Sequence, residues 1–267
     1  MIPPVVSQIP KGAVVADVRH YLDGRSGRAA YDGGHLPGAV FVDMDTVLAA
    51  PPSPQEGRHP LPDPAMFAAG LSAAGIGDGN TVIAYDDEGG VMAARLVWML
   101  RALGRDAALL DGGLLAYDGP LETGTPPRPV ARFTPRPWPA ERLASIDDAA
   151  DPGNVVIDAR QRERFRGEEE ALDPRAGHIP GARSVPAREN VGADGRFLGV
   201  EELRAKLSEA GVVRGADVVS YCGSGVTACH NLLAIEHAGL GEGRLYPGSW
   251  SQWSHTPRPA ATGPDRA

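Results

Sequence analysis

Short apolar runs alternate with helical patterns along the chain, and the series occurs twice. In the second half, β-branched runs predict strands at residues 154–157, 183–185, 217–221 and 244–246. Helical patterns are found at residues 160–165, 201–210, 227–238 and 249–253. Apolar strands that alternate with helices are typical of an open parallel sheet covered by helices on both faces. We therefore expect an α/β fold in each half, with ligands bound beyond the carboxyl ends of the strands.

The two halves repeat each other in the order, spacing and type of their elements. Residues 14–19 (VVADVR) return as residues 155–160 (VVIDAR), and residues 34–39 (GHLPGA) return as residues 177–182 (GHIPGA). The copies lie about 135 to 143 residues apart, which indicates a duplicated domain. Residues present in both copies are expected to be structural rather than reactive, and they are Asp17 and Asp158, Arg19 and Arg160, and His35 and His178.

A proline-rich segment joins the two copies. Six prolines fall between Pro126 and Pro139. Because proline fixes φ and removes a backbone donor, this segment is predicted to be an extended, semi-rigid connector. We expect a first domain over residues 1–124, a linker over residues 125–140 and a second domain over residues 141–267.

Charge and apolar patterning argue against several classes of partner. The formal net charge is −8, which disfavours a nucleic acid or an anionic membrane surface as the main partner. The most apolar helical stretch, residues 91–103, contains Arg95 and Arg101 and is too short to span a bilayer. The first residues have no basic region, so we expect no signal peptide there.

The chain has two cysteines, Cys222 and Cys229. Two cysteines cannot form a disulfide framework, and without a nearby pair of histidines they cannot form a structural zinc site. We therefore expect no metal and a reduced, cytoplasmic environment. Cys229 lies inside a predicted helix and is expected to be a buried structural residue.

Cys222 stands where a buried strand turns into a helix. The strand ends at Tyr221, and the helix begins near Thr227. A tight turn lies between them, formed by Gly223, Ser224, Gly225 and Val226. Glycines allow the backbone to fold around the sulfur, and amide N–H groups together with a helix N-terminus favour a bound anion. These features favour the thiolate of Cys222, which makes it a candidate nucleophile.

A cysteine at such a turn also serves protein tyrosine phosphatases. Those enzymes need an arginine six positions after the cysteine to bind the phosphoryl oxygens, and here that position is Ala228. Phosphatase chemistry is therefore disfavoured. The short turn suits a smaller reacting atom such as sulfur.

On these features the chain resembles the tandem rhodanese family of sulfurtransferases over nearly its whole length. The motifs that carry the resemblance are residues 158–160 (DAR), 164–167 (RFRG), 177–182 (GHIPGA), 222–228 (CGSGVTA) and 248–250 (GSW). The resemblance implies two rhodanese-like domains, of which the first is catalytically silent. This sequence agrees, because Asp86 takes the place of Cys222 in the first copy and a carboxylate cannot carry sulfur.

The resemblance also implies roles for residues outside the turn. Arg164 matches an arginine that binds the carboxylate or sulfonate of the sulfur donor. Arg175 is the nearest candidate for a second substrate arginine, and Arg166 is the alternative. His59 matches a histidine of mercaptopyruvate enzymes. With Asp45 and Ser224 it would form a relay that gives the pyruvate enolate its proton.

The expected reaction is transfer of a sulfane sulfur from 3-mercaptopyruvate through a persulfide on Cys222 to a thiol, a thioredoxin-like protein or cyanide. The turn resembles those of 3-mercaptopyruvate sulfurtransferases. Gly223 and Ser224 carry no positive charge, which suits a monoanionic keto acid better than dianionic thiosulfate. No cofactor is expected. Thiosulfate is the alternative donor, and a redox-sensing or binding module is the alternative of another class.

Overall fold

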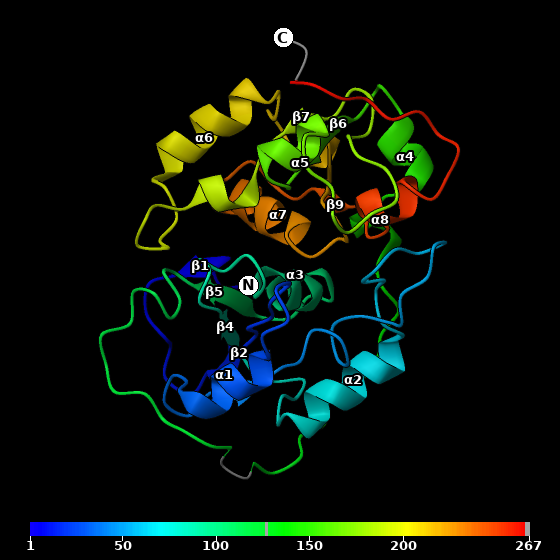
Figure 1. The fold of residues 1–267 in the computed structure, drawn as a ribbon. Coiled ribbons are helices and arrows are strands. Elements are labelled where there is room, and N and C mark those ends of the chain that lie inside the picture. The colour runs from blue at the N-terminus through cyan, green and yellow to red at the C-terminus, as the bar shows by residue number, and fades with distance from the viewer. Residues whose placement is uncertain (126–127, 265–267) are drawn as a thin grey trace. The chain divides into compact units, whose positions relative to one another are not determined.

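The computed structural model describes residues 1–125 and 128–264, and its contacts divide the chain into two compact units (Figure 1). Unit 1 comprises Met1–Ala50, Leu61–Trp138 and Val191–Phe197. Unit 2 comprises Pro51–Pro60, Pro139–Asn190 and the described residues from Leu198 onward. Each unit therefore contains one short segment that the sequence places in the other half.

The described residues of unit 1 form a five-stranded sheet with the strand order β1-β5-β4-β2-β3, in which every pair is parallel. The strands are β1 (Val5–Val6), β2 (Val14–Asp17), β3 (Val40–Phe41), β4 (Val82–Tyr85) and β5 (Ala107–Leu110). Helices in the described part of this unit are α1 (Gly27–Gly33), α2 (Pro64–Ala73) and α3 (Ala94–Ala102). Helix α3 packs against β4 and β5.

The described residues of unit 2 form a four-stranded parallel sheet with the order β7-β6-β8-β9. The strands are β6 (Val155–Asp158), β7 (Arg183–Ser184), β8 (Val218–Tyr221) and β9 (Arg244–Leu245). Helices in this part are α4 (Ile146–Ala150), α5 (Arg162–Arg166), α6 (Val200–Glu209), α7 (Ala228–His237) and α8 (Ser249–Trp253). Short 3-10 helices lie at Ala140–Arg142, Ala187–Asn190 and Gly215–Asp217.

The predicted α/β class with parallel sheets is confirmed, and each strand and helix predicted in the second half lies within two residues of its observed bounds. The largest difference is at α5, which was expected from residue 160 and begins at Arg162. Asp158 accepts the N–H of Arg160 at 2.9 Å and also binds its guanidinium, which holds the chain extended before the helix. Within the described ranges, no helix combines the length and the apolar character that crossing a bilayer requires.

Residues that occur in both copies have structural roles, as expected. Arg160 pairs with Asp158 at 2.7 Å and donates to the carbonyl of Gly177, and Arg19 makes the same contacts with Asp17 and Gly34. The two histidines of the repeated turns stack on an aromatic ring, His178 on Phe165 and His35 on Tyr31. Each pair is buried within its own unit, so neither histidine is available as a reactive group.

The segment predicted as a linker packs along unit 1 in its described part. Ala131 N–H donates to the carbonyl of Ser72 at 3.0 Å, and Phe133 is buried. The indole N–H of Trp138 donates to the carbonyl of Pro62 at 2.8 Å. Residues 128–138 therefore belong to unit 1, while residues 126 and 127 of the predicted linker lie outside the described residues.

Candidate active site

Cys222 lies at the carboxyl end of β8, at the centre of the parallel sheet of unit 2. Its side chain is 2% exposed, and the N–H of Gly225 points at its sulfur at 3.1 Å. Helix α7 begins at Ala228, and the first N–H groups of a helix have no partner within it. The sulfur therefore lies beside the Gly225 N–H and close in sequence to the start of α7, at the end of a strand, where ligands bind in folds of this kind.

Two glycines give this turn its shape, and Gly225 is the more constrained. It has a φ of +78°, and a Cβ at this position would lie 2.6 Å from the carbonyl oxygen of Pro247. A side chain would therefore collide with backbone, which cannot move aside as a flexible side chain can. Gly225 lets its N–H reach the sulfur of Cys222 while the chain passes directly over Pro247.

The start of helix α8 holds the other side of the turn. Trp250 N–H donates to the carbonyl of Cys222 at 3.0 Å, and Ser251 N–H donates to the carbonyl of Gly223 at 2.8 Å. The N–H of Cys222 donates to the hydroxyl of Ser249 at 3.2 Å. Ser249 has a φ of +54°, and among the described residues it is the one non-glycine residue with a positive φ. Backbone held in this conformation is strained, and the surrounding hydrogen bonds fix it in place.

Two guanidinium groups lie beside the turn. A Cβ built on Gly223 would lie 2.9 Å from Nη2 of Arg58 and 3.3 Å from Nη1 of Arg164. Arg164 was expected near the turn. Arg58 was not, although it directly precedes His59 in the sequence, and that adjacency is the signal that could have identified it.

The segment that carries Arg58 is fixed onto α8. Gly57 has a φ of +89°, and a Cβ there would lie 2.7 Å from the carbonyl oxygen of Gly248. The side-chain amide of Gln252 donates to the carbonyl of Gln55. These contacts explain why Pro51–Pro60 belongs to unit 2 and how its side chains come to lie beside Cys222.

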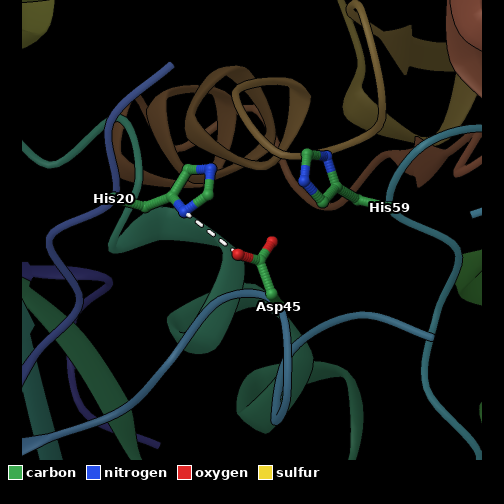
Figure 2. A group of neighbouring side chains, drawn as sticks. All are labelled: His20, Asp45 and His59. Carbon is green, nitrogen blue, oxygen red and sulfur yellow. Dashed lines mark ion pairs between the residues drawn. The ribbon is translucent and has the colours of Figure 1, made fainter. Parts of the chain in front are cut away.

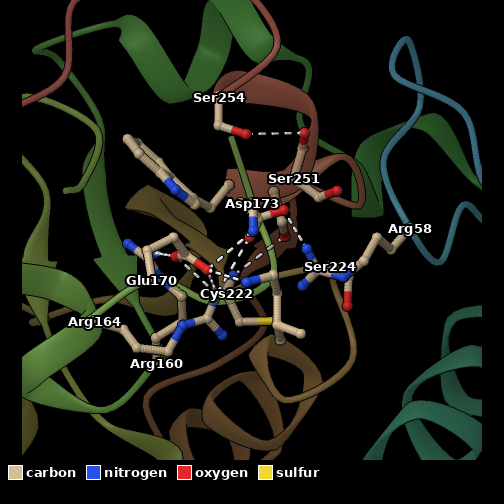
Figure 3. A network of polar contacts seen from close by, with 12 residues as sticks. Arg58, Arg160, Arg164, Glu170, Asp173, Cys222, Ser224, Ser251 and Ser254 are labelled. Carbon is tan, nitrogen blue, oxygen red and sulfur yellow. Dashed lines mark hydrogen bonds and ion pairs between the residues drawn. The ribbon is translucent and has the colours of Figure 1, made fainter. Parts of the chain in front are cut away.

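Two buried carboxylates hold the two arginines (Figure 3). Asp173 accepts from Arg58 through one oxygen and from Arg164, at 3.2 Å, through the other. Glu170 accepts from Nη2 of Arg164 at 2.8 and 2.9 Å, and its Oε2 lies 3.6 Å from Arg160. The side chains of Asp173 and Glu170 are 1% and 4% exposed, so the carboxylates are shielded from water, whereas Arg58 and Arg164 are 26% and 19% exposed.

The two carboxyl groups differ in their tendency to ionise. Burial raises the pKa of Asp173, the charge of Glu170 raises it further, and the attraction of Arg58 and Arg164 offsets only part of this rise. Burial also opposes ionisation of Glu170. Hydrogen bonds from Arg164 and from the N–H groups of Leu172 and Asp173 outweigh that effect, and the pKa of Glu170 is lowered.

His59 lies against the turn. Its Nδ1 is 2.7 Å from the hydroxyl oxygen of Ser224, which is 7% exposed. This hydrogen bond joins two members of the expected relay. The third, Asp45, belongs to unit 1, where it is largely exposed and its Oδ2 lies 3.9 Å from Nδ1 of His20 (Figure 2).

Arg175 has a different place from the one expected of a substrate arginine. Its guanidinium donates to the carbonyls of Trp253, Ser254, Thr256 and Arg258 at 2.8 to 3.0 Å. Its own carbonyl accepts from the indole N–H of Trp250. Because its donors hold the chain that follows α8, the assignment of Arg175 to substrate binding is replaced by a structural role.

In unit 1 the corresponding turn holds a carboxyl group. One oxygen of Asp86 accepts the N–H groups of Glu88 and Gly90 at 2.8 and 2.7 Å. The other accepts those of Met92 and Ala93 at 2.8 and 2.9 Å. Asp86 is fully buried, and burial raises its pKa although the four N–H groups favour the ionised form. The turn between this strand and its helix therefore forms a cup of main-chain donors around one acidic side chain.

The sequence matches the family described as "Rhodanese-like domain" twice, over residues 6–119 and 141–256. The chain therefore belongs to the rhodanese family, in the class that carries two such domains in tandem. Its relatives are enzymes of the sulfurtransferase class, and so is this chain.

Individual relatives narrow the comparison. A Pseudomonas aeruginosa protein named as a probable 3-mercaptopyruvate sulfurtransferase is 45% identical, over 94% of this chain and 92% of its own length. A Mycobacterium tuberculosis protein named as a candidate thiosulfate sulfurtransferase is 42% identical, over 93% of this chain and 90% of its own. The structure of the 3-mercaptopyruvate sulfurtransferase from Leishmania major aligns with a TM-score of 0.83 at 35% identity, covering 93% of this chain and 72% of that chain.

Proposed function

We propose that the chain moves a sulfane sulfur from 3-mercaptopyruvate to a thiol acceptor through a persulfide on Cys222. The observation that carries the proposal is the position of this sulfur, at the end of β8 with the Gly225 N–H directed at it and two guanidinium groups beside the turn. Two of the three relatives described above bear the name of this donor.

The first half-reaction is a displacement at sulfur. The Cys222 thiolate attacks the sulfur of 3-mercaptopyruvate and forms an S–S bond. The C–S bond breaks, and its electron pair leaves with carbon as the enolate of pyruvate. His59 and Ser224, joined at 2.7 Å, are placed to deliver the proton that converts the enolate into pyruvate. Asp45 remains the candidate to orient His59.

The second half-reaction returns the enzyme to its starting state. An acceptor thiolate attacks the terminal sulfur of the persulfide, and the electron pair of the S–S bond returns to Cys222. A thiol acceptor leaves as a persulfide, and cyanide, which attacks the same sulfur, leaves as thiocyanate. A small thiol, a thioredoxin-like protein or cyanide fits this step, and the cytoplasm fits two buried cysteines that form no disulfide.

Main-chain donors stabilise the persulfide. In the repeat, Gly225 corresponds to Gly90, and residues 227–228 correspond to residues 92–93. The Gly90 N–H binds one oxygen of Asp86, while the N–H groups of residues 92–93 bind the other. By this correspondence the Gly225 N–H holds the cysteine sulfur, and the N–H groups of residues 227–228 hold the terminal sulfur.

The donor carboxylate binds Arg58 and Arg164. A guanidinium forms paired hydrogen bonds with a planar carboxylate, and here two such groups lie beside Gly223. Thiosulfate stays the second candidate donor, because the Mycobacterium tuberculosis relative bears that name. The first copy is silent in this proposal, because Asp86 fills the place of the reactive thiol.

The test is the intact mass of the protein after brief treatment with 3-mercaptopyruvate. We expect the mass to rise by one sulfur atom, and the rise to disappear after a thiol acceptor is added. The Cys229→Ser variant should gain the sulfur, since this thiol donates to the carbonyl of Gly225 inside the fold. An unmodified wild-type chain, or a Cys222→Ser variant that still turns over, would exclude the mechanism.

A further inference from the structure

Each of the two arginines beside the turn binds a buried carboxylate with one terminal nitrogen and has its other terminal nitrogen near Gly223. Arg58 uses Nη1 for Asp173, and its Nη2 is the atom nearest a Cβ built on Gly223. Arg164 uses Nη2 for Asp173 and Glu170, and its Nη1 is the next nearest. Each guanidinium is therefore held on one side by a buried carboxylate and presents its other side to the turn that carries Cys222.

The charges of this network cancel when every group is ionised. The positive groups are Arg58, Arg160 and Arg164, and the negative groups are Asp158, Glu170 and Asp173. Hydrogen-bond donors are thus present beside the turn without an excess of positive charge. Such a site has donors for a carboxylate, but it offers no net charge to balance a second negative charge on the same ligand.

Asp173 is the group on which this balance depends. Of the residues that the structure describes, it alone contacts both guanidinium groups that flank Gly223, one through each oxygen (Figure 3). Its side chain is 1% exposed, so water does little to screen its charge from a ligand on the far side of the arginines. Among the described residues, Glu170 contacts Arg164 and Arg160 but not Arg58.

We propose that Asp173 is a positioning residue that fixes the donor specificity of the enzyme. It aims Arg58 and Arg164 at the donor carboxylate and cancels charge that would otherwise attract a dianion. A monoanionic donor such as 3-mercaptopyruvate is then favoured over thiosulfate. This inference rests on the proposed function, because it assumes that the donor binds beside Gly223.

The test compares kcat/KM for 3-mercaptopyruvate and for thiosulfate, with dithiothreitol as the acceptor for both, in the wild type and in Asp173→Asn. The substitution keeps the shape of the side chain and leaves one uncancelled positive charge. A dianion gains about twice the Coulomb energy that a monoanion gains. We therefore expect the ratio of thiosulfate to 3-mercaptopyruvate kcat/KM to rise about tenfold, mainly through KM, and to rise less at high salt.

The matched control is Glu201→Gln, which neutralises an acidic side chain that is 86% exposed on α6 of the same unit. Its donor ratio should equal that of the wild type. Asp173→Glu keeps the charge, so its ratio should stay near that of the wild type even if its rates fall. Arg58→Gln removes a positive charge and should move the ratio in the opposite direction, which gives a second test should Asp173→Asn fail to fold.

Equal losses for both donors in Asp173→Asn would show a purely structural role and overturn the inference. An unchanged ratio in Asp173→Asn, or in Arg58→Gln, would do the same. Failure of the proposed function gives a different result, because the wild type itself would then form no persulfide with 3-mercaptopyruvate.

Discussion

At the scale of single residues, the reactivity of Cys222 depends on neighbours of two kinds: some can be predicted from the sequence, and others are found only in the structure. The strand end, the glycines and the helix start are adjacent in the chain, so their pattern alone predicted a turn around an anionic sulfur. Arg58 reaches the same turn from a distant segment and is bound there by Asp173. Ser249 accepts the N–H of Cys222 while its own backbone has a positive φ, and the residue type alone does not predict this conformation. Such roles follow from packing between segments, which periodicity does not report.

Gly225 should be the least replaceable residue of the turn. In Gly225→Ala the new Cβ meets the carbonyl oxygen of Pro247 at 2.6 Å, so the N–H must move away from the sulfur of Cys222. We expect kcat/KM for 3-mercaptopyruvate to fall about a hundredfold, the usual effect of losing one preorganised donor. Steady-state kinetics on the folded variant provides the measurement.

The control for this substitution is Gly241→Ala. Gly241 has a similar backbone, with a φ of +91°, but nothing lies within 4 Å of a Cβ there. The Gly241→Ala variant should lose a little stability and keep its activity. A Gly225→Ala variant as active as this control would contradict the role given to the N–H.

At the scale of elements, the sequence predicted most of what positions the site. Strand β8 and helices α7 and α8 were found from their apolar patterns, because a strand buried on both faces reads as a continuous apolar run. Helix α4 was not predicted. It has five residues, and its start depends on a capping box between Ser145 and Asp148 rather than on an apolar stripe.

The capping box of α4 should make a measurable, pH-dependent contribution to stability. Asp148 accepts from the hydroxyl and the N–H of Ser145 and from Arg244, and these bonds lower its pKa to about 2. In Asp148→Asn we expect the free energy of unfolding at pH 7 to fall by roughly 1 kcal/mol, after allowance for solvent screening. Because folding lowers the pKa of Asp148, the stabilisation by its carboxylate is complete above about pH 4 and is lost as the pH falls through about 2.

Denaturant unfolding of the wild type and of Asp148→Asn, repeated from pH 7 down to the lowest pH at which both stay folded, measures this difference. Ser145→Ala provides the matched partner, and the double variant should lose less than the sum of the two single losses. A difference between wild type and Asp148→Asn that grows on acidification would show that the sign is wrong.

At the scale of the whole molecule, the sequence showed the duplication but not the exchange of segments. Pro51–Pro60 belongs to unit 2, and Val191–Phe197 belongs to unit 1, where the N–H of Phe197 donates to Asp111 at 2.8 Å. Domain boundaries drawn from a repeat follow the order of the chain. Loop contacts such as that of Gly57 with Gly248 depend on a close approach of two backbone segments. The sequence carries no periodic signal for such an approach.

A fragment of residues 139–267 should therefore be a poor enzyme although it contains Cys222. It lacks Arg58 and His59, so it has one of the two guanidinium groups beside Gly223 and no partner for Ser224. We expect its rate of persulfide formation with 3-mercaptopyruvate, followed by mass, to be at least about tenfold below that of the full chain. Adding a fragment of residues 1–138, which carries the missing segment, should restore part of the rate. A wild-type rate from residues 139–267 alone would contradict the role of the segment.

The exchange of Pro51–Pro60 and Val191–Phe197 has a consequence for how such a gene can evolve. After a duplication, selection can erase the chemistry of one copy, as a carboxylate at Asp86 would do, without making that copy dispensable. A deletion of either copy would also remove residues that complete the surviving one. A first copy without a reactive thiol can therefore be retained, because it supplies residues that complete the second copy.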